Sequence, residues 1–73
     1  MKNLQWEFVD SSNIKAISYN ENREKLYLSF HSGGIYEYDN VPQPEYEGLI
    51  YADSIGSYFY KNIRGVYNYR KIG

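Results

Sequence analysis

The side chains best suited to chemistry in this 73-residue chain gather in its last third, where cations alternate with aromatic rings. Residues 54–73 carry four Lys or Arg side chains and no acid, a balance of +4, whereas residues 1–53 have a balance of −5. Cations can meet phosphate while neighbouring rings stack on bases, so this composition is typical of nucleotide and nucleic-acid sites. Arg64 is the expected phosphate contact, because one guanidinium can hold two oxygens. With one tyrosine from the central strands added, the candidate ligand-binding residues are Arg64, Lys61, Arg70, Lys71, Tyr60, Tyr67 and Tyr27.

The same basic segment also has a purely structural interpretation. Lys61 and Arg64 would complement the negative end of a helix dipole, and Arg70 and Lys71 would form an ordinary solvated tail. The net charge of −1 also argues against strong nonspecific binding to polyanions. The sequence leaves the ligand-binding and the structural interpretation open.

A second candidate surface is formed by the tyrosines of the central strands. Tyr27, Tyr36 and Tyr38 could stack exposed bases on an open sheet face. We favour the alternative that Tyr36 and Tyr38 pack beneath helices, because a small core needs its aromatic rings. Glu37 and Asp39 are then expected to face water. Tyr27 points to the opposite face and is the better candidate for exposure.

The sequence offers no convincing catalytic group. His31 lies beside Ser32 but has no evident third partner for nucleophilic catalysis. Glu45 and Glu47, two apart on a predicted helix, point in different directions and make a poor acid–base pair. The Ser-Gly-Gly run that begins at Ser32 is too short to cradle phosphate. With a single histidine and no cysteine, we also expect no metal site, and no cofactor is implied.

Four strands are expected to position these residues. Alternation of apolar and polar residues predicts strands at 4–8, 14–19, 26–30 and 35–39. The alternation breaks near Ala16 and Ile17, which indicates a bulge or burial on both faces. Polar clusters at 10–13 and 20–23 predict the first two turns. Gly33 follows Ser32 between the last two strands and predicts a hairpin turn with positive φ.

The spacing of apolar residues changes from a strand period to a helix period after Val41 and Pro42, and Pro42 ends the sheet there. A short helix is predicted from Pro44, with Tyr46, Leu49 and Ile50 on one stripe. Asp53 or Ser54 should cap a second helix, which Gly65 ends. That helix carries Ile55, Phe59 and Ile63 on its apolar stripe, and Val66, Tyr67 and Tyr69 predict a returning strand.

The fold class that follows is α+β: an antiparallel β-meander of four strands, then two short helices and a short returning C-terminal strand. Residues 1–73 are expected to form a single domain. At this length most of the 14 aromatic residues must be structural. The absence of cysteine, of a leader and of a long apolar stretch leads us to expect a cytoplasmic protein with no membrane association.

Short motifs spread over residues 9–70 resemble those of one known family. The motifs are Ser11-Ser12-Asn13-Ile14, Tyr19, Ser32-Gly33-Gly34, Tyr36-x-Tyr38, Val41-Pro42, Ser54-x-Gly56, Phe59, Ile63-Arg64 and Tyr67. In order and spacing they resemble the KTSC domain, a module named for the C-terminal end of some lysyl-tRNA synthetases that also occurs as a free-standing small protein. The resemblance implies RNA binding and assigns no catalytic residue.

This chain departs from the pattern of that family at three positions. Relatives often carry a basic or neutral residue where Glu37 and His31 stand, and a small polar residue where Tyr60 stands. Glu37 would repel phosphate on the sheet face, which weakens an RNA interpretation of that face.

Three functions remain as hypotheses. The first is a non-catalytic binding module for RNA or a nucleotide-like ligand. The second is a homo-oligomeric protein-interaction module anchored by exposed tyrosines. The third joins them: an oligomer that traps a small nucleotide signal, as a phage or other mobile-element protein would do to blunt a host response.

Overall fold

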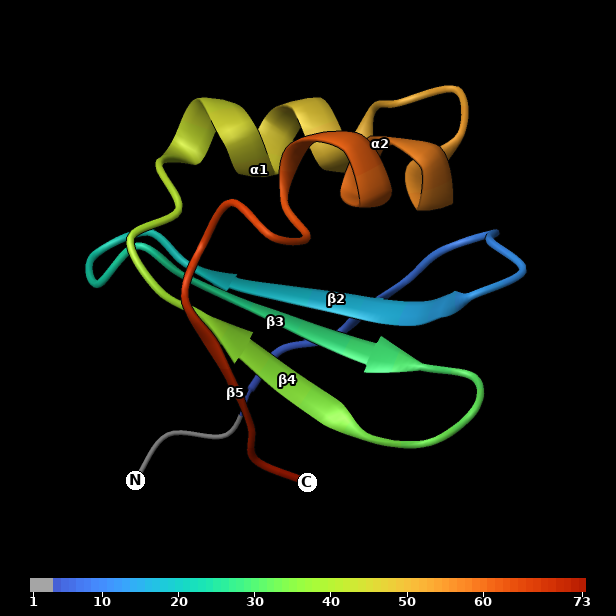
Figure 1. Cartoon of the computed structure of the whole chain (residues 1–73), viewed down its shortest axis with the longest axis horizontal. Helices are drawn as coiled ribbons and strands as arrows, with labels where there is room; N and C mark the ends of the chain where they lie inside the picture. The colour runs from blue at the N-terminus through green and yellow to red at the C-terminus, as the bar shows by residue number, and fades with distance from the viewer. Residues whose placement is uncertain (1–3) are drawn as a thin grey trace.

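In the computed structural model, which describes residues 4–73, two helices lie across one face of a five-stranded antiparallel sheet (Figure 1). The strands neighbour one another in chain order, so the sheet is a meander to which the last strand returns. The elements are β1 (Glu7–Phe8), β2 (Ile14–Asn20), β3 (Lys25–Phe30), β4 (Ile35–Tyr38), α1 (Gln43–Ile50), α2 (Ile55–Asn62) and β5 (Tyr69–Lys71). This arrangement confirms the predicted α+β class.

The predicted irregularity in the second strand is a β-bulge. The register of β2 against β3 shifts between Ile14 and Ala16, and both residues are buried. Because the bulge inserts one residue, Ile14 faces the helices together with Ile17, although they are three residues apart. A run that breaks alternation is thereby buried on both faces of the sheet.

The hairpin of β3 and β4 turns through Gly33 and Gly34, whose φ angles are 99° and 98°. Its register pairs Leu26 with Tyr38, so both side chains face the helices. Leu26 is fully buried and Tyr38 is 4% exposed. The expectation that the strand-four tyrosines pack beneath the helices is confirmed, since Tyr36 also packs against the core.

Helix α1 begins at Gln43, one residue before the predicted Pro44, and α2 has the predicted cap and stop residue. Ser54 caps α2, and its hydroxyl accepts a hydrogen bond from the Ser57 N–H at 3.2 Å. Gly65, with φ of 79°, turns the chain just past the helix. In α1, a Cβ on Gly48 would collide with the Tyr58 hydroxyl, so close helix packing explains this interior glycine.

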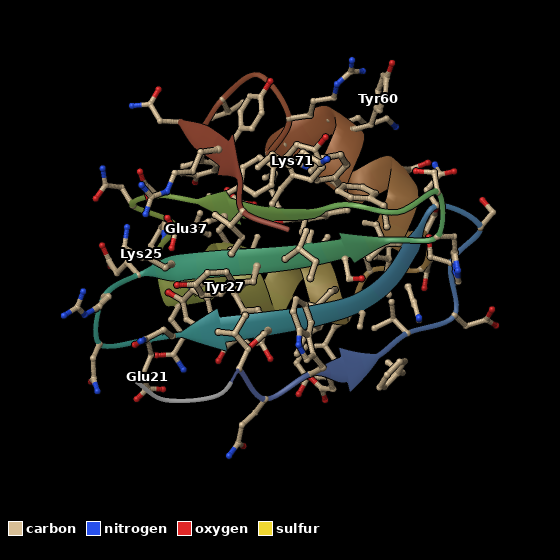
Figure 2. The ribbon with its side chains drawn as sticks, turned by 90° about the horizontal axis from the view of Figure 1, so that it is seen from below. Glu21, Lys25, Tyr27, Glu37, Tyr60 and Lys71 are labelled. Carbon is tan, nitrogen blue, oxygen red and sulfur yellow. The ribbon has the colours of Figure 1, made fainter. Side chains whose placement is uncertain are left out.

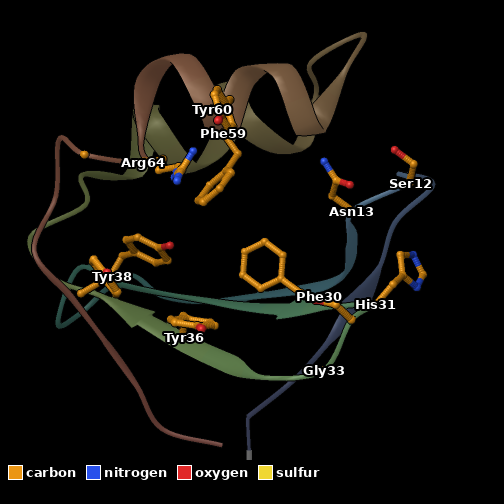
Figure 3. Close-up of a pocket in the computed structure, with 13 residues that line it drawn as sticks. Ser12, Asn13, Phe30, His31, Gly33, Tyr36, Tyr38, Phe59, Tyr60 and Arg64 are labelled. Atoms are coloured by element: carbon orange, nitrogen blue, oxygen red, sulfur yellow. The ribbon is translucent and has the colours of Figure 1, made fainter.

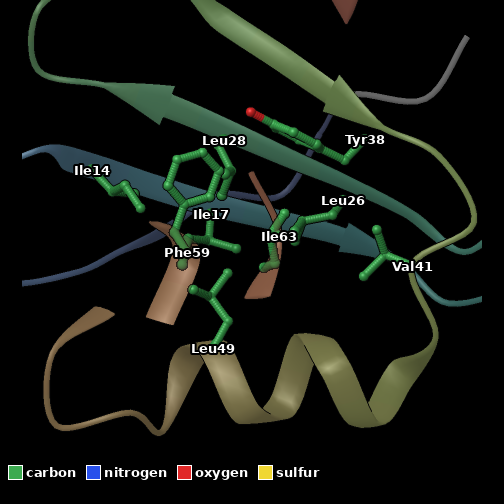
Figure 4. Close-up of a cluster of buried hydrophobic side chains, with 9 residues drawn as sticks. All are labelled: Ile14, Ile17, Leu26, Leu28, Tyr38, Val41, Leu49, Phe59 and Ile63. Atoms are coloured by element: carbon green, nitrogen blue, oxygen red, sulfur yellow. The ribbon is translucent and has the colours of Figure 1, made fainter. Parts of the chain in front are cut away.

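The core fills the space between the helices and the sheet (Figure 4). At its edge the rings of Tyr19 and Tyr46 stack with centroids 4.4 Å apart, and the Tyr19 hydroxyl donates to the Val41 carbonyl. Its buried members are Ile14, Ile17, Leu26, Leu28, Tyr38, Val41, Leu49, Phe59 and Ile63. Between residues 4 and 73, no helix is long and apolar enough to cross a membrane.

Two strand predictions are wrong in detail. β1 is only Glu7–Phe8, and Phe8 is 73% exposed, because it pairs with Ala16 on the face that the helices leave open. The last strand starts at Tyr69 rather than Val66. The N–H groups of Val66 and Tyr67 still donate to the Ile63 carbonyl, so the backbone there is a turn.

Candidate functional site

A pocket of about 610 Å³ opens between α2 and the β3–β4 hairpin (Figure 3). Rings from the sheet line it on one side, α2 lines it on the other, and the loop before β2 and the hairpin turn close one end. Such a volume is in the usual range for small-ligand sites. The lining residues are Ser12, Asn13, Phe30, His31, Ser32, Gly33, Tyr36, Tyr38, Phe59, Tyr60, Arg64, Gly65 and Tyr69.

The aromatic walls hold one another in place. Phe30 meets Tyr36 and Phe59 edge to face, with ring centroids 5.5 and 5.6 Å apart. Tyr38 meets Phe59 in the same way at 5.8 Å. Edge-to-face contacts are favourable geometries for aromatic pairs, so these rings form a rigid apolar surface before any ligand arrives.

The Tyr38 hydroxyl is the unusual polar group of this surface. The residue is 4% exposed, yet its hydroxyl has no hydrogen-bond partner among residues 4–73. No polar side-chain atom in that range is both sealed from solvent and unpaired, so the hydroxyl must reach the open space of the pocket. Figure 3 shows it pointing toward the middle of the pocket. Burial, with smaller contributions from Tyr69 and Tyr36, raises the Tyr38 pKa to about 12, and the Arg64 charge opposes the rise.

The electrostatic character of the pocket is positive. The guanidinium carbon of Arg64 lies 4.6 Å from the centre of the Tyr60 ring, a cation–π contact that holds the charge at the pocket wall. None of the thirteen lining residues is Asp or Glu, although the chain has nine acids. His31 Nε2 lies 2.9 Å from the Ser11 carbonyl and donates to it, which fixes the ring at the mouth. The pocket therefore offers donors and a cation with no opposing carboxylate.

A smaller hollow of about 300 Å³ adjoins the pocket. It shares Ser12, Asn13 and Tyr60 with the larger one, and Lys61 is among its other lining residues. Two of the predicted ligand residues, Arg64 and Tyr60, thus line the main pocket, and Lys61 lies next to it. Lys71 is close by at the hairpin, where its Cε would lie 3.3 Å from a Cβ placed on Gly34.

Two other predicted ligand residues lie on the opposite face of the sheet (Figure 2). Tyr27 donates to Glu37 Oε2 at 2.9 Å, and Arg70 Nε donates to Oε1 of the same carboxylate at 2.9 Å. Lys25 adds a bond of 2.6 Å to Asp39 and lies 3.8 Å from Glu37. The cross-strand register sets Tyr27, Glu37 and Arg70 in one row, so Arg70 neutralises Glu37 there.

The expected exposure of this row is wrong. Tyr27 is 9% exposed and Glu37 is 6% exposed, whereas both were expected to face water. A carboxylate can be buried at this position because two cations and a phenol compensate it. Burial raises the Tyr27 pKa, and its bond to Glu37 adds to the rise. Arg70 and Tyr27 are therefore occupied away from the pocket.

Tyr67 is also occupied by the fold. Its hydroxyl donates to Glu45 Oε1 at 3.0 Å, while Tyr58 donates to Oε2 of that carboxylate at 2.5 Å. Glu45 therefore joins α1 to α2 and to the segment that follows α2. Within residues 4–73 no three His, Asp or Glu side chains cluster as metal ligands.

Sequence reasoning missed most of the pocket wall. The sequence predicts a turn at Ser12 and Asn13, finds no catalytic partner for His31, and assigns Tyr36 and Tyr38 to the core alone. One signal was present: eight of the thirteen lining residues belong to the motifs that carry the family resemblance. These eight are Ser12, Asn13, Ser32, Gly33, Tyr36, Tyr38, Phe59 and Arg64. Motif residues scattered over the chain thus converge on one pocket.

Comparison with known proteins agrees with the fold and with these motifs. The KTSC domain family model matches residues 10–67. A crystal structure of a KTSC domain protein from Yersinia pestis superposes with a TM-score of 0.93 at 34% identity, covering 97% of this chain and 100% of that one. A lysine–tRNA ligase of Nostoc sp. is 43% identical over 63 residues, or 86% of this chain. The chain spans only 11% of that ligase's length. A protein of Stutzerimonas stutzeri is 33% identical over 51 residues, covering 70% of this chain and 72% of the relative.

Proposed function

This chain belongs to the KTSC domain family, and from that premise we propose that it is a non-catalytic binding module for a nucleotide unit. The unit is held in the aromatic pocket, either as a free nucleotide or as an unpaired residue of RNA. The tRNA in the name of its ligase relatives supports the RNA form, although the match covers a small part of those proteins.

One observation carries this proposal: Arg64 lies at the wall of a ring-lined pocket that contains no carboxylate. Aromatic walls suit a base, since every base has faces that stack. A guanidinium beside them suits the phosphate attached to that base. An uncharged aromatic ligand would leave the Arg64 charge unused, so the pocket fits an anionic ring-bearing ligand better.

The pocket gives little support to catalysis. Its histidine donates to the Ser11 carbonyl, and it contains no carboxylate that could orient that ring or act as a general base. Tyr38 keeps its proton near neutral pH, as any tyrosine of ordinary pKa does, and burial raises its pKa further, to about 12. Binding without chemistry therefore accounts for the lining residues.

The cytoplasmic location expected from the sequence stays a prediction.

Titration of the isotope-labelled protein with nucleoside monophosphates and short single-stranded RNA would test the proposal by NMR. We expect saturable shifts at Asn13, Tyr36 and Arg64, while Tyr27 and Arg70 on the opposite face stay unchanged. Absence of saturable binding at low salt, or shifts confined to the opposite face, would contradict it.

Self-association is a second candidate, supported by exposed apolar side chains. Tyr60, Val66 and Tyr69 are 60–63% exposed near the pocket mouth. Such residues are common interface anchors, and a second copy covering them would close the pocket. Light scattering, which measures the molar mass in solution, distinguishes a monomer from an oligomer. A strict monomer would exclude self-association. If an oligomer forms, mass spectrometry of heat-released small molecules would test whether it sequesters a nucleotide signal.

A further inference from the structure

We propose that the Tyr38 hydroxyl determines which base the pocket accepts, by donating a hydrogen bond to an oxo group on the ring of the ligand. The pocket would then prefer guanine to adenine and uracil to cytosine, because each preferred base carries an oxo group where its counterpart carries an amino group. This inference rests on the proposed function and adds the chemical class of base to it.

The ring of Tyr38 is fixed before any ligand binds. Its backbone pairs with Leu26 on one side and with Tyr69 on the other. Phe59 packs edge-on against the ring, and the Tyr69 ring stacks on it with centroids 5.5 Å apart. The hydroxyl therefore has a defined position inside the pocket, as a group that discriminates between ligands requires.

The fold leaves this hydroxyl unused, in contrast to the other tyrosines that hold the structure together. Tyr19 donates to the Val41 carbonyl, and Tyr27 donates to Glu37. The remaining members of this group also donate to carboxylates: Tyr46 to Glu7, and both Tyr58 and Tyr67 to Glu45. Tyr38 is more buried than Tyr27, yet its hydroxyl has no partner among residues 4–73. Because the hydroxyl opens to the pocket, water can pair with it there. A ligand that fills the pocket displaces that water, so an atom of the ligand must take its place.

The ligand atom must be an acceptor. Arg64 can only donate, and the lining contains no carboxylate that could take the Tyr38 proton. If Tyr38 accepted a bond from an amino group instead, its own proton would stay unpaired. We therefore place an exocyclic oxo group against the hydroxyl, because its oxygen accepts the proton and an amino group at the same position of the ring cannot.

The size of the preference follows from the cost of an unmade bond. A neutral hydrogen bond is worth about three- to tenfold in affinity, and a buried donor left unpaired adds to that difference. We therefore expect the affinity for a guanine ligand to exceed that for its adenine counterpart about tenfold, and likewise for uracil over cytosine.

Calorimetry with GMP against AMP and UMP against CMP would test the inference on three proteins: the unchanged chain, Tyr38→Phe and Tyr51→Phe. Tyr51 is 80% exposed and does not line the pocket, so its variant controls for loss of one hydroxyl. We expect the unchanged chain and Tyr51→Phe to prefer GMP and UMP about tenfold. Tyr38→Phe should bind both members of each pair equally, at the weaker affinity.

The outcomes separate this inference from the proposed function. Nucleotides that bind the unchanged chain without the oxo preference, or a preference that survives in Tyr38→Phe, would overturn the inference alone. Failure of all four nucleotides to bind would overturn the proposed function as well. Tyr38→Phe removes only an unpaired hydroxyl, so its melting temperature should match that of the unchanged chain. A variant that fails to fold would also contradict the inference, because the hydroxyl would then have a structural partner.

Discussion

Arg70 Nε lies 2.9 Å from Glu37 Oε1, and this ion pair holds Arg70 on the face of the sheet opposite the helices. Arg70 is held on the open face by a buried carboxylate, while Arg64 remains at the pocket on the helix side. Arg64 and Arg70, both in the basic last third of the sequence, therefore have separate roles. Arg70 reaches the open face because successive side chains of β5 alternate: Tyr69 points toward the helices and Arg70 points away from them.

Removal of the Glu37 charge should destabilise the protein. In Glu37→Gln, Lys25 and Arg70 lose their shared counter-ion and Tyr27 loses a charged acceptor. We expect a loss of about 1–3 kcal/mol in the free energy of unfolding, measured by urea denaturation. Glu21→Gln, in an exposed turn, is the matched control and should change stability by less than about 0.5 kcal/mol. Equal effects of the two variants would contradict the role given to Glu37.

Gly48→Ala should also destabilise, although alanine is the better helix former. The added Cβ would collide with the Tyr58 hydroxyl, at an expected cost of about 1–3 kcal/mol that exceeds the gain in helix propensity. In a Tyr58→Ala background the same substitution should become neutral or stabilising. A double-mutant cycle by thermal denaturation measures this coupling. A cycle with no coupling energy would show that the Tyr58 contact does not set the requirement for glycine.

Stability should fall as pH rises from about 10 to about 12. The pKa values of Tyr38, Tyr46 and Tyr58 are each raised to about 12, mainly by burial for the first two and by the bond to Glu45 for Tyr58. Over this range these three tyrosines ionise in the unfolded chain but keep their protons in the folded chain, so their ionisation favours unfolding. Melting temperatures should therefore decline above pH 10. Titration of all ten tyrosines near pH 10, seen by absorbance without loss of structure, would contradict these pKa shifts.

Much of the scaffold could be predicted because it follows from local rules. Positive φ at the hairpin glycines, the Ser54 cap and the stop at Gly65 each depend on a few neighbouring residues. The bulge in β2 also follows from a local break in alternation. These features need no knowledge of which strands pair.

The rest depends on contacts between distant segments. Glu37 is buried because β5 brings Arg70 beside it. The sequence predicts the start of that strand at Val66, whereas the structure begins it at Tyr69. Phe8 is exposed because it pairs with Ala16 on the open face. The pocket was missed because Tyr38 was interpreted as core, and only the structure reveals that its hydroxyl lacks a partner.

The most direct test of the central claim is the affinity of the Arg64→Ala variant for GMP and for short single-stranded RNA, measured over a range of salt concentrations. Arg23→Ala is the matched control, since Arg23 is an exposed arginine in the turn between β2 and β3. We expect Arg64→Ala to weaken binding about tenfold or more and to lower the salt slope by about 1, whereas Arg23→Ala should leave both unchanged. Equal effects of the two variants, or no binding by the unchanged chain at low salt, would contradict the claim.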